Sequence, residues 1–164
     1  MKYLFIIRHA KSDWNNPILS DFERPLNNRG NKDAPDMAIR LKDKNFVIDQ
    51  FVTSTANRAL STAKYFAHVY GKSENDILKI DELYHASPKI FFRTIEKLNN
   101  QYHSVAIFSH NPGITDFVNM LTKTQIDNMP TCSIFAISIQ TESWKLFSTA
   151  KKEFLFFDYP KSIL

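Results

Sequence analysis

The sequence predicts an α/β fold, a three-layer α/β/α sandwich with a mostly parallel central sheet. Short apolar segments typical of buried strands alternate along the chain with longer segments whose apolar residues recur at helical spacing. The chain has 164 residues, of which 43% are hydrophobic, so one globular domain over residues 1–164 with a full core is expected. Such alternation favours parallel strands, because crossover helices then cover both faces of the sheet.

The expected strands are short runs rich in β-branched and aromatic residues. They cover residues 3–7, 48–53, 77–80, 105–108, 133–140 and about 143–150. The last two, joined at Thr141-Glu142, are expected to form a hairpin that adds an antiparallel edge to the sheet. The tail that follows, KEFLFFDYP, is too apolar to stay free in solvent and is expected to pack back on the protein.

Each expected helix carries one apolar face. The first covers about residues 31–44, and Ser54 or Thr55 is expected to cap the second. The four buried faces consist of Ala34, Met37, Ala38 and Leu41; Ala59, Ala63, Phe66, Ala67 and Tyr70; Ile90, Phe91, Thr94, Ile95 and Leu98; and Ile114, Phe117, Val118 and Leu121. Residues 10–27 are polar and contain prolines, which indicates a long loop, and such loops are usually functional or disordered.

Composition narrows the classes of function. No segment approaches the roughly 20 apolar residues needed to cross a bilayer, and Arg8 interrupts the first apolar run before it reaches signal-peptide length. The single Cys132 permits no intramolecular disulfide, so a cytoplasmic protein without a membrane partner is expected. The net charge of +4 is spread over scattered lysines, which argues against a nucleic-acid partner and suits a small anionic substrate.

Polar side chains follow four of the expected strands at the point where each strand ends. They are Arg8 and His9; Ser54, Thr55 and Arg58; Glu82; and His110 with Asn111. In an open α/β sheet the carboxyl ends of parallel strands meet at one edge, where ligands bind and helix N-termini point. Each residue alone is more often a surface or packing residue, but two arginines, two histidines and a carboxylate together predict a cationic pocket for a phosphoryl group.

A zinc site is the alternative interpretation of the two histidines. The neighbouring arginines would repel a cation, and no carboxylate adjoins His9 or His110 in the sequence. We therefore expect neither a metal nor another cofactor.

The motifs in this order resemble a known family. IIRHAKSDW is similar to the Arg-His-Gly signature of the histidine phosphatase superfamily, which includes the cofactor-dependent phosphoglycerate mutases, with Ala10 in place of the glycine. RHAKSDW, DFERPLNNRG, TSTANRALSTA, DELYHASP and FSHNPG more closely resemble the SixA-type phosphohistidine phosphatases, over Tyr3 to about Leu121. The resemblance implies a phosphoglycerate mutase-like fold. The chain lacks the long insertions of the mutases, which favours a phosphatase.

The resemblance also implies a role for each pocket residue. His9 would be the nucleophile that takes the phosphoryl group, and Arg8, Arg58 and His110 would hold that group. Glu82 matches a position where larger members carry a proton donor.

Further residues are assigned to the pocket rim on the same basis. They are Arg24, Leu26 and Gly30 from the Arg-Pro-Leu segment, Ser12 and Trp14, and Asn15 as a phosphate contact. Asn111, which follows His110 at a strand end and helix start, is expected to be a further substrate contact.

The expected function is a metal-independent phosphatase that forms a phosphohistidine intermediate and acts on protein phosphohistidine. A phosphorylated imidazole leaves readily, whereas an alcohol needs a general acid. Two alternatives stay open. The first is a phosphomonoesterase that acts on a small phosphorylated metabolite and uses Glu82 as its general acid. A non-catalytic phosphate-binding module would have no need for His9 and His110.

Overall fold

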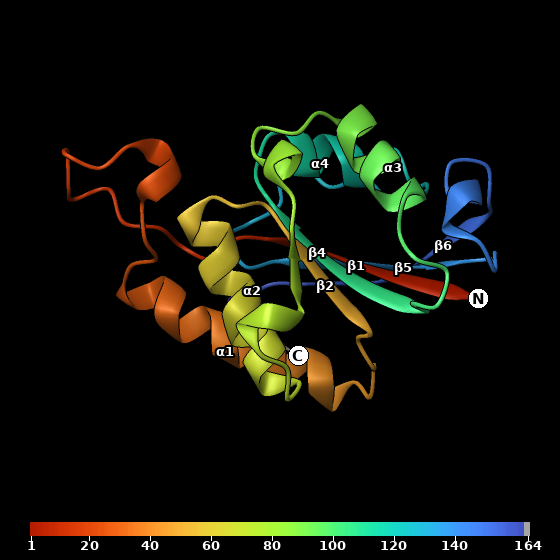
Figure 1. Ribbon diagram of the computed structural model, residues 1–164, viewed down its shortest axis with the longest axis horizontal. Helices are drawn as coiled ribbons and strands as arrows, with labels where there is room; N and C mark the ends of the chain where they lie inside the picture. The colour runs from red at the N-terminus through yellow and green to blue at the C-terminus, as the bar shows by residue number, and fades with distance from the viewer. Residues whose placement is uncertain (163–164) are drawn as a thin grey trace.

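A six-stranded sheet forms the centre of the computed structural model, which describes residues 1–162 (Figure 1). Its strands are β1 (Lys2–Arg8), β2 (Gln50–Thr53), β3 (Ile77–Lys79), β4 (Ser104–Ser109), β5 (Ile134–Ile139) and β6 (Lys152–Asp158). They lie in the order β3-β2-β4-β1-β5-β6. The first four are parallel, β5 is antiparallel to β1, and β6 is antiparallel to β5. The expected mostly parallel sheet is confirmed.

Helices cover both faces of this sheet, which confirms the expected three layers (Figure 1). Helices α1 (Asn28–Asp43) and α2 (Asn57–Val69) lie on one face, and α3 (Pro88–Glu96) and α4 (Gly113–Val118) lie on the other. Four short 3-10 turns complete the structure: η1 (Asp21–Glu23), η2 (Glu74–Asp76), η3 (Asp81–Leu83) and η4 (Trp144–Leu146). Within residues 1–162, no helix has the length and apolar character that a membrane crossing requires.

The central strand β1 shows how the sequence builds two cores. Its side chains alternate between the two faces, as the period of a strand requires. Leu4 and Ile6 pack in the core under α3 and α4, whereas Phe5 and Ile7 pack in the core under α1 and α2. All four are fully buried, so β1 is held from both sides and its carboxyl end is fixed in position.

The expected hairpin strand over residues 143–150 is wrong. Residues 144–146 instead form η4, and Trp144 and the following Phe147 are both buried in the core beside α3. The Trp144 indole nitrogen donates to the Tyr102 carbonyl oxygen at 2.9 Å, which fixes the turn. The second edge strand is β6, formed by the apolar tail, so the expectation that this tail packs on the protein is confirmed.

The expected cap of the second helix is also wrong. Helix α2 begins one residue later, with Ala56 at the N-cap and no capping side chain. The Ser54 hydroxyl is used elsewhere, in a 2.8 Å hydrogen bond with His110 Nε2, and the Thr55 hydroxyl donates to the Asp81 carboxylate at 2.7 Å. Ser54, which was expected to cap α2, therefore contacts His110 at the end of β4 instead.

The long loop over residues 10–27 extends from the end of β1 at one end of the molecule (Figure 1). Ser12 and Leu26 form an isolated antiparallel bridge that closes the loop on itself. At Gly30, in the first turn of α1, a Cβ atom would lie 2.1 Å from the Lys11 carbonyl oxygen, so only glycine allows this approach. The loop therefore starts and ends at fixed points, with η1 between them.

Candidate active site

His9 follows the last residue of β1 and is 6% exposed. Its Nδ1 lies 2.7 Å from the Ala10 carbonyl oxygen, and its Nε2 accepts a hydrogen bond from Arg58 Nε at 3.3 Å. A carbonyl oxygen only accepts and a guanidinium only donates, so Nδ1 carries the proton and Nε2 presents its lone pair. The ring is thereby held in the tautomer that suits nucleophilic attack by Nε2.

Both pocket histidines are neutral at pH 7. Burial lowers the pKa of His9 to about 3, the Ala10 carbonyl opposes part of this effect, and the charges of Arg58 and Arg8 add to it. Burial also lowers the pKa of His110 to about 2, with smaller contributions from His9 and Arg58. The two ring centroids lie 5.1 Å apart. The pocket thus holds two uncharged imidazoles among cations.

Arg58 lies in the first turn of α2 and is 5% exposed. Its Nε points at His9, its Nη1 donates to the Asp21 carbonyl oxygen at 2.7 Å, and its Nη2 donates to Asp21 Oδ2 at 3.0 Å. A cation is not favoured at a helix N-terminus, so the contacts at the end of β1 and in η1 must hold it there.

Arg8 and His110 each carry a buried nitrogen that lacks a hydrogen-bond partner among the described residues. These atoms are Arg8 Nε and His110 Nδ1. Arg8 Nη1 donates to the Met129 carbonyl oxygen at 2.8 Å, and His110 Nε2 is paired with Ser54. Burial lowers the pKa of Arg8, and the charge of Arg58 lowers it further. Since buried polar groups are nearly always paired, these two nitrogens fit a site that receives an anion.

Arg24 joins this cluster from the loop over residues 10–27. Its Nε and Nη2 donate to Asp21 Oδ1 at 3.2 and 3.0 Å, and its Nη1 donates to the Ser12 hydroxyl at 2.5 Å. The guanidinium carbon lies 3.5 Å from the centre of the Trp14 ring, a stacked cation–π contact. The structure therefore brings Arg24, Ser12 and Trp14 into contact with one another, and their role at the rim of the pocket stays a prediction.

Asp21 and Tyr84 were missed by sequence reasoning. The Tyr84 hydroxyl donates to Asp21 Oδ2 at 2.5 Å, and the Tyr84 ring lies edge-on to His110 with centroids 5.4 Å apart. Burial would raise the pKa of Asp21, but hydrogen bonds from Tyr84 and Arg24 and the charge of Arg58 hold that pKa well below its usual value. Both residues lie inside motifs that carry the family resemblance, DFERPL and DELYHASP, which is the only signal the sequence offered.

Two predicted substrate contacts, Asn111 and Asn15, lie outside the cluster of arginines and histidines. The Asn111 side-chain nitrogen donates to Asn128 Oδ1 at 2.8 Å and to the Met129 carbonyl oxygen at 3.2 Å, so it holds the segment that Arg8 contacts. Asn15 is exposed on the long loop, and among the described residues its side chain hydrogen-bonds none of the pocket residues. The structure does not bring Asn15 into the cluster.

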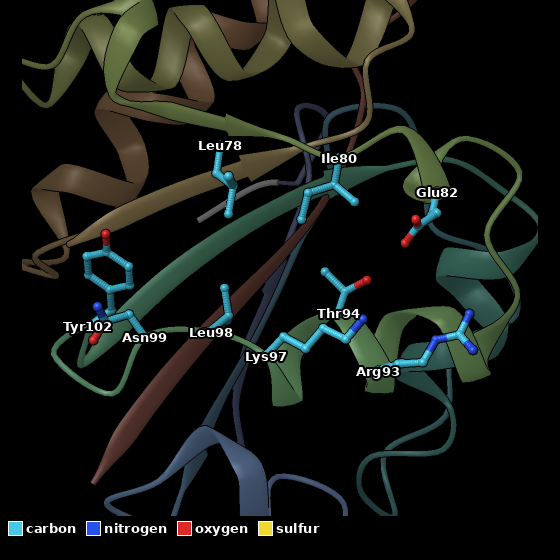
Figure 2. Close-up of a pocket in the computed structure, with 9 residues that line it drawn as sticks. All are labelled: Leu78, Ile80, Glu82, Arg93, Thr94, Lys97, Leu98, Asn99 and Tyr102. Carbon is cyan, nitrogen blue, oxygen red and sulfur yellow. The ribbon is translucent and has the colours of Figure 1, made fainter.

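Glu82 forms no hydrogen bond with His9 or His110 among the described residues. Its side chain lines the end of a groove of about 300 Å³ between β3 and α3, in which Arg93 and Lys97 lie on the helix side (Figure 2). Across residues 1–162, no side-chain hydrogen bond or ion pair involves the Glu82 carboxylate. Its role as a proton donor stays a prediction.

The part of the chain that the structure describes contains no cluster of side chains suited to binding a metal ion. There, no three histidine, cysteine, aspartate or glutamate side chains gather in an arrangement that would hold a metal ion. Metal independence itself stays a prediction for experiment.

Comparisons with known structures give the same fold. The structure of a protein from Agrobacterium tumefaciens assigned as phosphohistidine phosphatase SixA superposes with a TM-score of 0.81 at 24% identity, covering 97% of this chain and 98% of that one. The protein histidine phosphatase SixA in complex with tungstate also gives a TM-score of 0.81, at 21% identity, with 96% and 97% coverage. These matches establish the phosphoglycerate mutase-like fold expected from the sequence.

Sequence comparisons identify one related plant protein and one matching family model. An uncharacterized chloroplastic protein from Arabidopsis thaliana is 27% identical over 151 residues, which cover 87% of this chain and 68% of that protein. The family model described as histidine phosphatase superfamily, branch 1, matches residues 4–84, which contain His9, Arg24, Arg58 and Glu82. Over residues 4–84 the chain therefore matches the histidine phosphatase superfamily, and over nearly its whole length it shares the fold of the SixA structures.

Proposed function

We propose that this protein is a metal-independent phosphatase that forms a phosphohistidine on His9 and acts on protein phosphohistidine. The observation that carries the proposal is the state of His9: buried, neutral, with Nδ1 tied to Ala10 and Nε2 facing Arg58. Nε2 is available as a nucleophile at pH 7, and the arginines supply the positive charge that a transferring phosphoryl group needs.

The reaction has two steps. The His9 Nε2 lone pair attacks phosphorus in line with the leaving nitrogen, so one N–P bond forms as the substrate's N–P bond breaks. Water then attacks the phosphorylated His9, the new N–P bond breaks, and inorganic phosphate leaves. Nδ1 keeps its proton throughout, donated to the Ala10 carbonyl oxygen, so His9 returns to its starting tautomer.

The oxygens of the phosphoryl group have three partners in this proposal. Arg58 transfers its Nε hydrogen bond from His9 to a phosphoryl oxygen, and the unpaired Arg8 Nε and His110 Nδ1 provide two further contacts. Tungstate, an oxyanion of the same kind as phosphate, is bound in a SixA structure of this fold, which supports an anion site.

The choice of phosphohistidine rests on the leaving group. An imidazole protonated on its second nitrogen leaves as a neutral molecule, whereas an alcohol leaves well only with help from a general acid. Within residues 1–162 the Glu82 carboxylate has no hydrogen bond to the pocket residues and faces a separate groove (Figure 2). A site without a well-placed acid favours the easier leaving group. A cytoplasmic location and a phosphorylated protein as partner belong to the same proposal.

The test is a substrate panel measured in EDTA. We expect kcat/KM to be highest for a phosphohistidine peptide and lower for phosphotyrosine, phosphoserine and small phosphoesters, with no loss on chelation. Rapid quenching should trap acid-labile phosphate on the wild-type protein and none on His9→Ala, which should be inactive but folded. A small phosphoester that outperforms the peptide would establish the phosphomonoesterase alternative. Tight phosphate binding without turnover would establish a binding module, and activity restored by zinc or magnesium after chelation would refute metal independence.

A further inference from the structure

Asp21 places a carboxylate against the arginines that would bind the substrate phosphoryl group. Its Oδ1 accepts from Arg24 Nε and Nη2, and its Oδ2 accepts from Arg58 Nη2 and from the Tyr84 hydroxyl. Its carbonyl oxygen accepts from Arg58 Nη1. With Nε on His9, all three nitrogens of the Arg58 guanidinium are engaged.

The charges around the pocket make this carboxylate significant. Arg8, Arg24 and Arg58 are cationic, and both histidines are neutral. Among the described residues, Asp21 is the acidic group that forms ion pairs with these arginines. It cancels one of three positive charges before any substrate arrives.

A carboxylate and a phosphoryl group present the same kind of acceptor to a guanidinium. Arginine binds either through a pair of parallel hydrogen bonds, and its nitrogens provide five N–H donors. Arg58 Nη2 must therefore share its donors between Asp21 and an incoming phosphoryl group, or give up Asp21. The two anions also repel each other across the pocket, and this repulsion grows with the charge of the substrate.

We propose that Asp21 is a specificity-determining residue, an internal anion that competes with phosphate for Arg58 and disfavours substrates of high negative charge. This inference rests on the proposed function only in taking the pocket of His9 and Arg58 as the phosphoryl site. Inorganic phosphate and dianionic phosphoesters bind weakly because of Asp21. A phosphohistidine substrate, whose imidazole accepts a proton and offsets one negative charge, is affected less. The product phosphate is also released more easily.

The variant Asp21→Asn separates charge from shape. Asparagine keeps the size of the side chain, one of the two acceptor oxygens, and the backbone carbonyl that holds Arg58 Nη1, while its NH2 group replaces the second acceptor. Glu23→Gln is the matched control, because it removes the same charge two residues away in η1, where the side chain is exposed. Within residues 1–162, no side-chain hydrogen bond or ion pair involves Glu23.

The experiment measures the binding of inorganic phosphate by calorimetry and kcat/KM for the peptide and for an alkyl phosphate. Asp21→Asn should bind phosphate about tenfold more tightly, as expected when one like charge is removed close to a partly exposed site, and Glu23→Gln should stay within about twofold of wild type. The difference should shrink as ionic strength rises, because the Asp21 side chain is 41% exposed. The alkyl phosphate should gain more than the peptide, so selectivity for phosphohistidine falls.

Unchanged or weaker phosphate binding by Asp21→Asn would overturn the proposal and leave Asp21 as a residue that only orders Arg58. An equal change in Glu23→Gln would also overturn it, because the effect would then be one of net charge. Asp21→Ser provides the same test if the asparagine variant does not fold. A wild-type protein that binds phosphate but hydrolyses no phosphohistidine would refute the proposed function, while the phosphate comparison would still decide the role of Asp21.

Discussion

At the scale of single residues, burial leaves the two histidines of the pocket neutral and its arginines charged. His9 and His110 lose their charge because both are buried and lie near arginines, whereas the arginines keep theirs because their pKa values start far above neutrality. The same burial that makes His9 a nucleophile therefore has a cost in stability when protons are abundant.

The first prediction concerns the pH dependence of stability. The pKa of His9 is about 3 in the folded protein and about 6.5 in the unfolded chain, so the unfolded chain binds the proton first as pH falls. Stability is lost progressively from about pH 6.5 toward pH 3. Between pH 7 and pH 5 the wild type should lose about 2 kcal/mol more than His9→Asn in urea unfolding.

Imidazole nitrogen chemical shifts provide an independent check. His9 should remain the neutral tautomer with the proton on Nδ1 from pH 8 to pH 5. A His9 titration midpoint between pH 6 and pH 7 would contradict the buried, neutral state and, with it, the extra loss of stability.

Arg58 gives the second prediction at this scale. Arg58→Ala should lower kcat by roughly 10³-fold or more with a smaller change in KM, since the guanidinium acts on charge that spreads over the phosphoryl oxygens in the transition state. Arg29→Ala is a suitable control because Arg29 pairs with Asp33 within α1 and, among the described residues, forms no side-chain hydrogen bond with the pocket residues. Steady-state kinetics measure both, and an unchanged kcat in Arg58→Ala would remove this residue from catalysis.

At the scale of elements, the start of α1 sets the position of the long loop. Asn27 accepts from the Gly30 backbone nitrogen at 2.9 Å as the N-cap, and Gly30 lies directly against Lys11. The loop that carries Arg24 and Asp21 is therefore positioned by backbone packing and does not depend on its own side chains alone.

Gly30→Ala tests this arrangement. The added methyl group would lie 2.1 Å from a backbone oxygen, so either the helix or the loop must move, and overpacking of this kind costs about 1–3 kcal/mol. We expect a loss of stability in that range in urea unfolding, together with weaker phosphate binding as Arg24 shifts. Asn28→Ala, at an exposed position in the same turn, should change stability by less than about 0.5 kcal/mol. Equal stability of the two variants would show that the contact is unimportant.

The sequence predicted those features of the elements that depend on apolar periodicity and on where each strand ends. The apolar alternation of β1 and the helical spacing of Ala34 to Leu41 were sufficient for the layers, and the ends of β1, β2 and β4 predicted His9, Arg58 and His110. The choice of edge strand was not predictable, because residues 143–150 and 152–160 are both apolar and only tertiary packing of Trp144 decides between them.

The polar contacts of the site were also beyond sequence reasoning. Ser54 was assigned to a helix cap because the sequence shows only its neighbours along the chain, whereas its hydroxyl pairs with His110, 56 residues away. Asp21 lies in a loop without periodicity, so nothing local indicates that it pairs with Arg58, 37 residues further on.

At the scale of the whole molecule, the last strand is attached to the first helix by an ion pair. Arg40 on α1 donates to the Asp158 carboxylate at 3.0 Å and to the Tyr159 carbonyl oxygen at 3.0 Å. The Asp158 side chain is 3% exposed, and this pair lies on the far side of β5 from the pocket.

Arg40→Met should therefore destabilise the protein without affecting catalysis. Removal of one partner leaves a buried carboxylate uncompensated, and the loss should be about 3 kcal/mol. The double variant Arg40→Met with Asp158→Asn should recover part of it, and kcat should match wild type at temperatures where both are folded. Thermal and urea unfolding measure the first effect. A single variant as stable as wild type would show that Asp158 has enough solvent contact to dispense with Arg40.

The central position of β1 in the sheet bears on how the protein folds as it is synthesised. Residues 2–8 pair with β4 at residues 104–109 and with β5 at residues 134–139, and β2 also reaches β4. Until those segments leave the ribosome, the first hundred residues can form only the β2–β3 pair of the sheet. Contacts so distant in sequence slow folding. We therefore expect the strand with four core residues in a row, Leu4 to Ile7, to be prone to aggregation until β4 and β5 are available to pair with it.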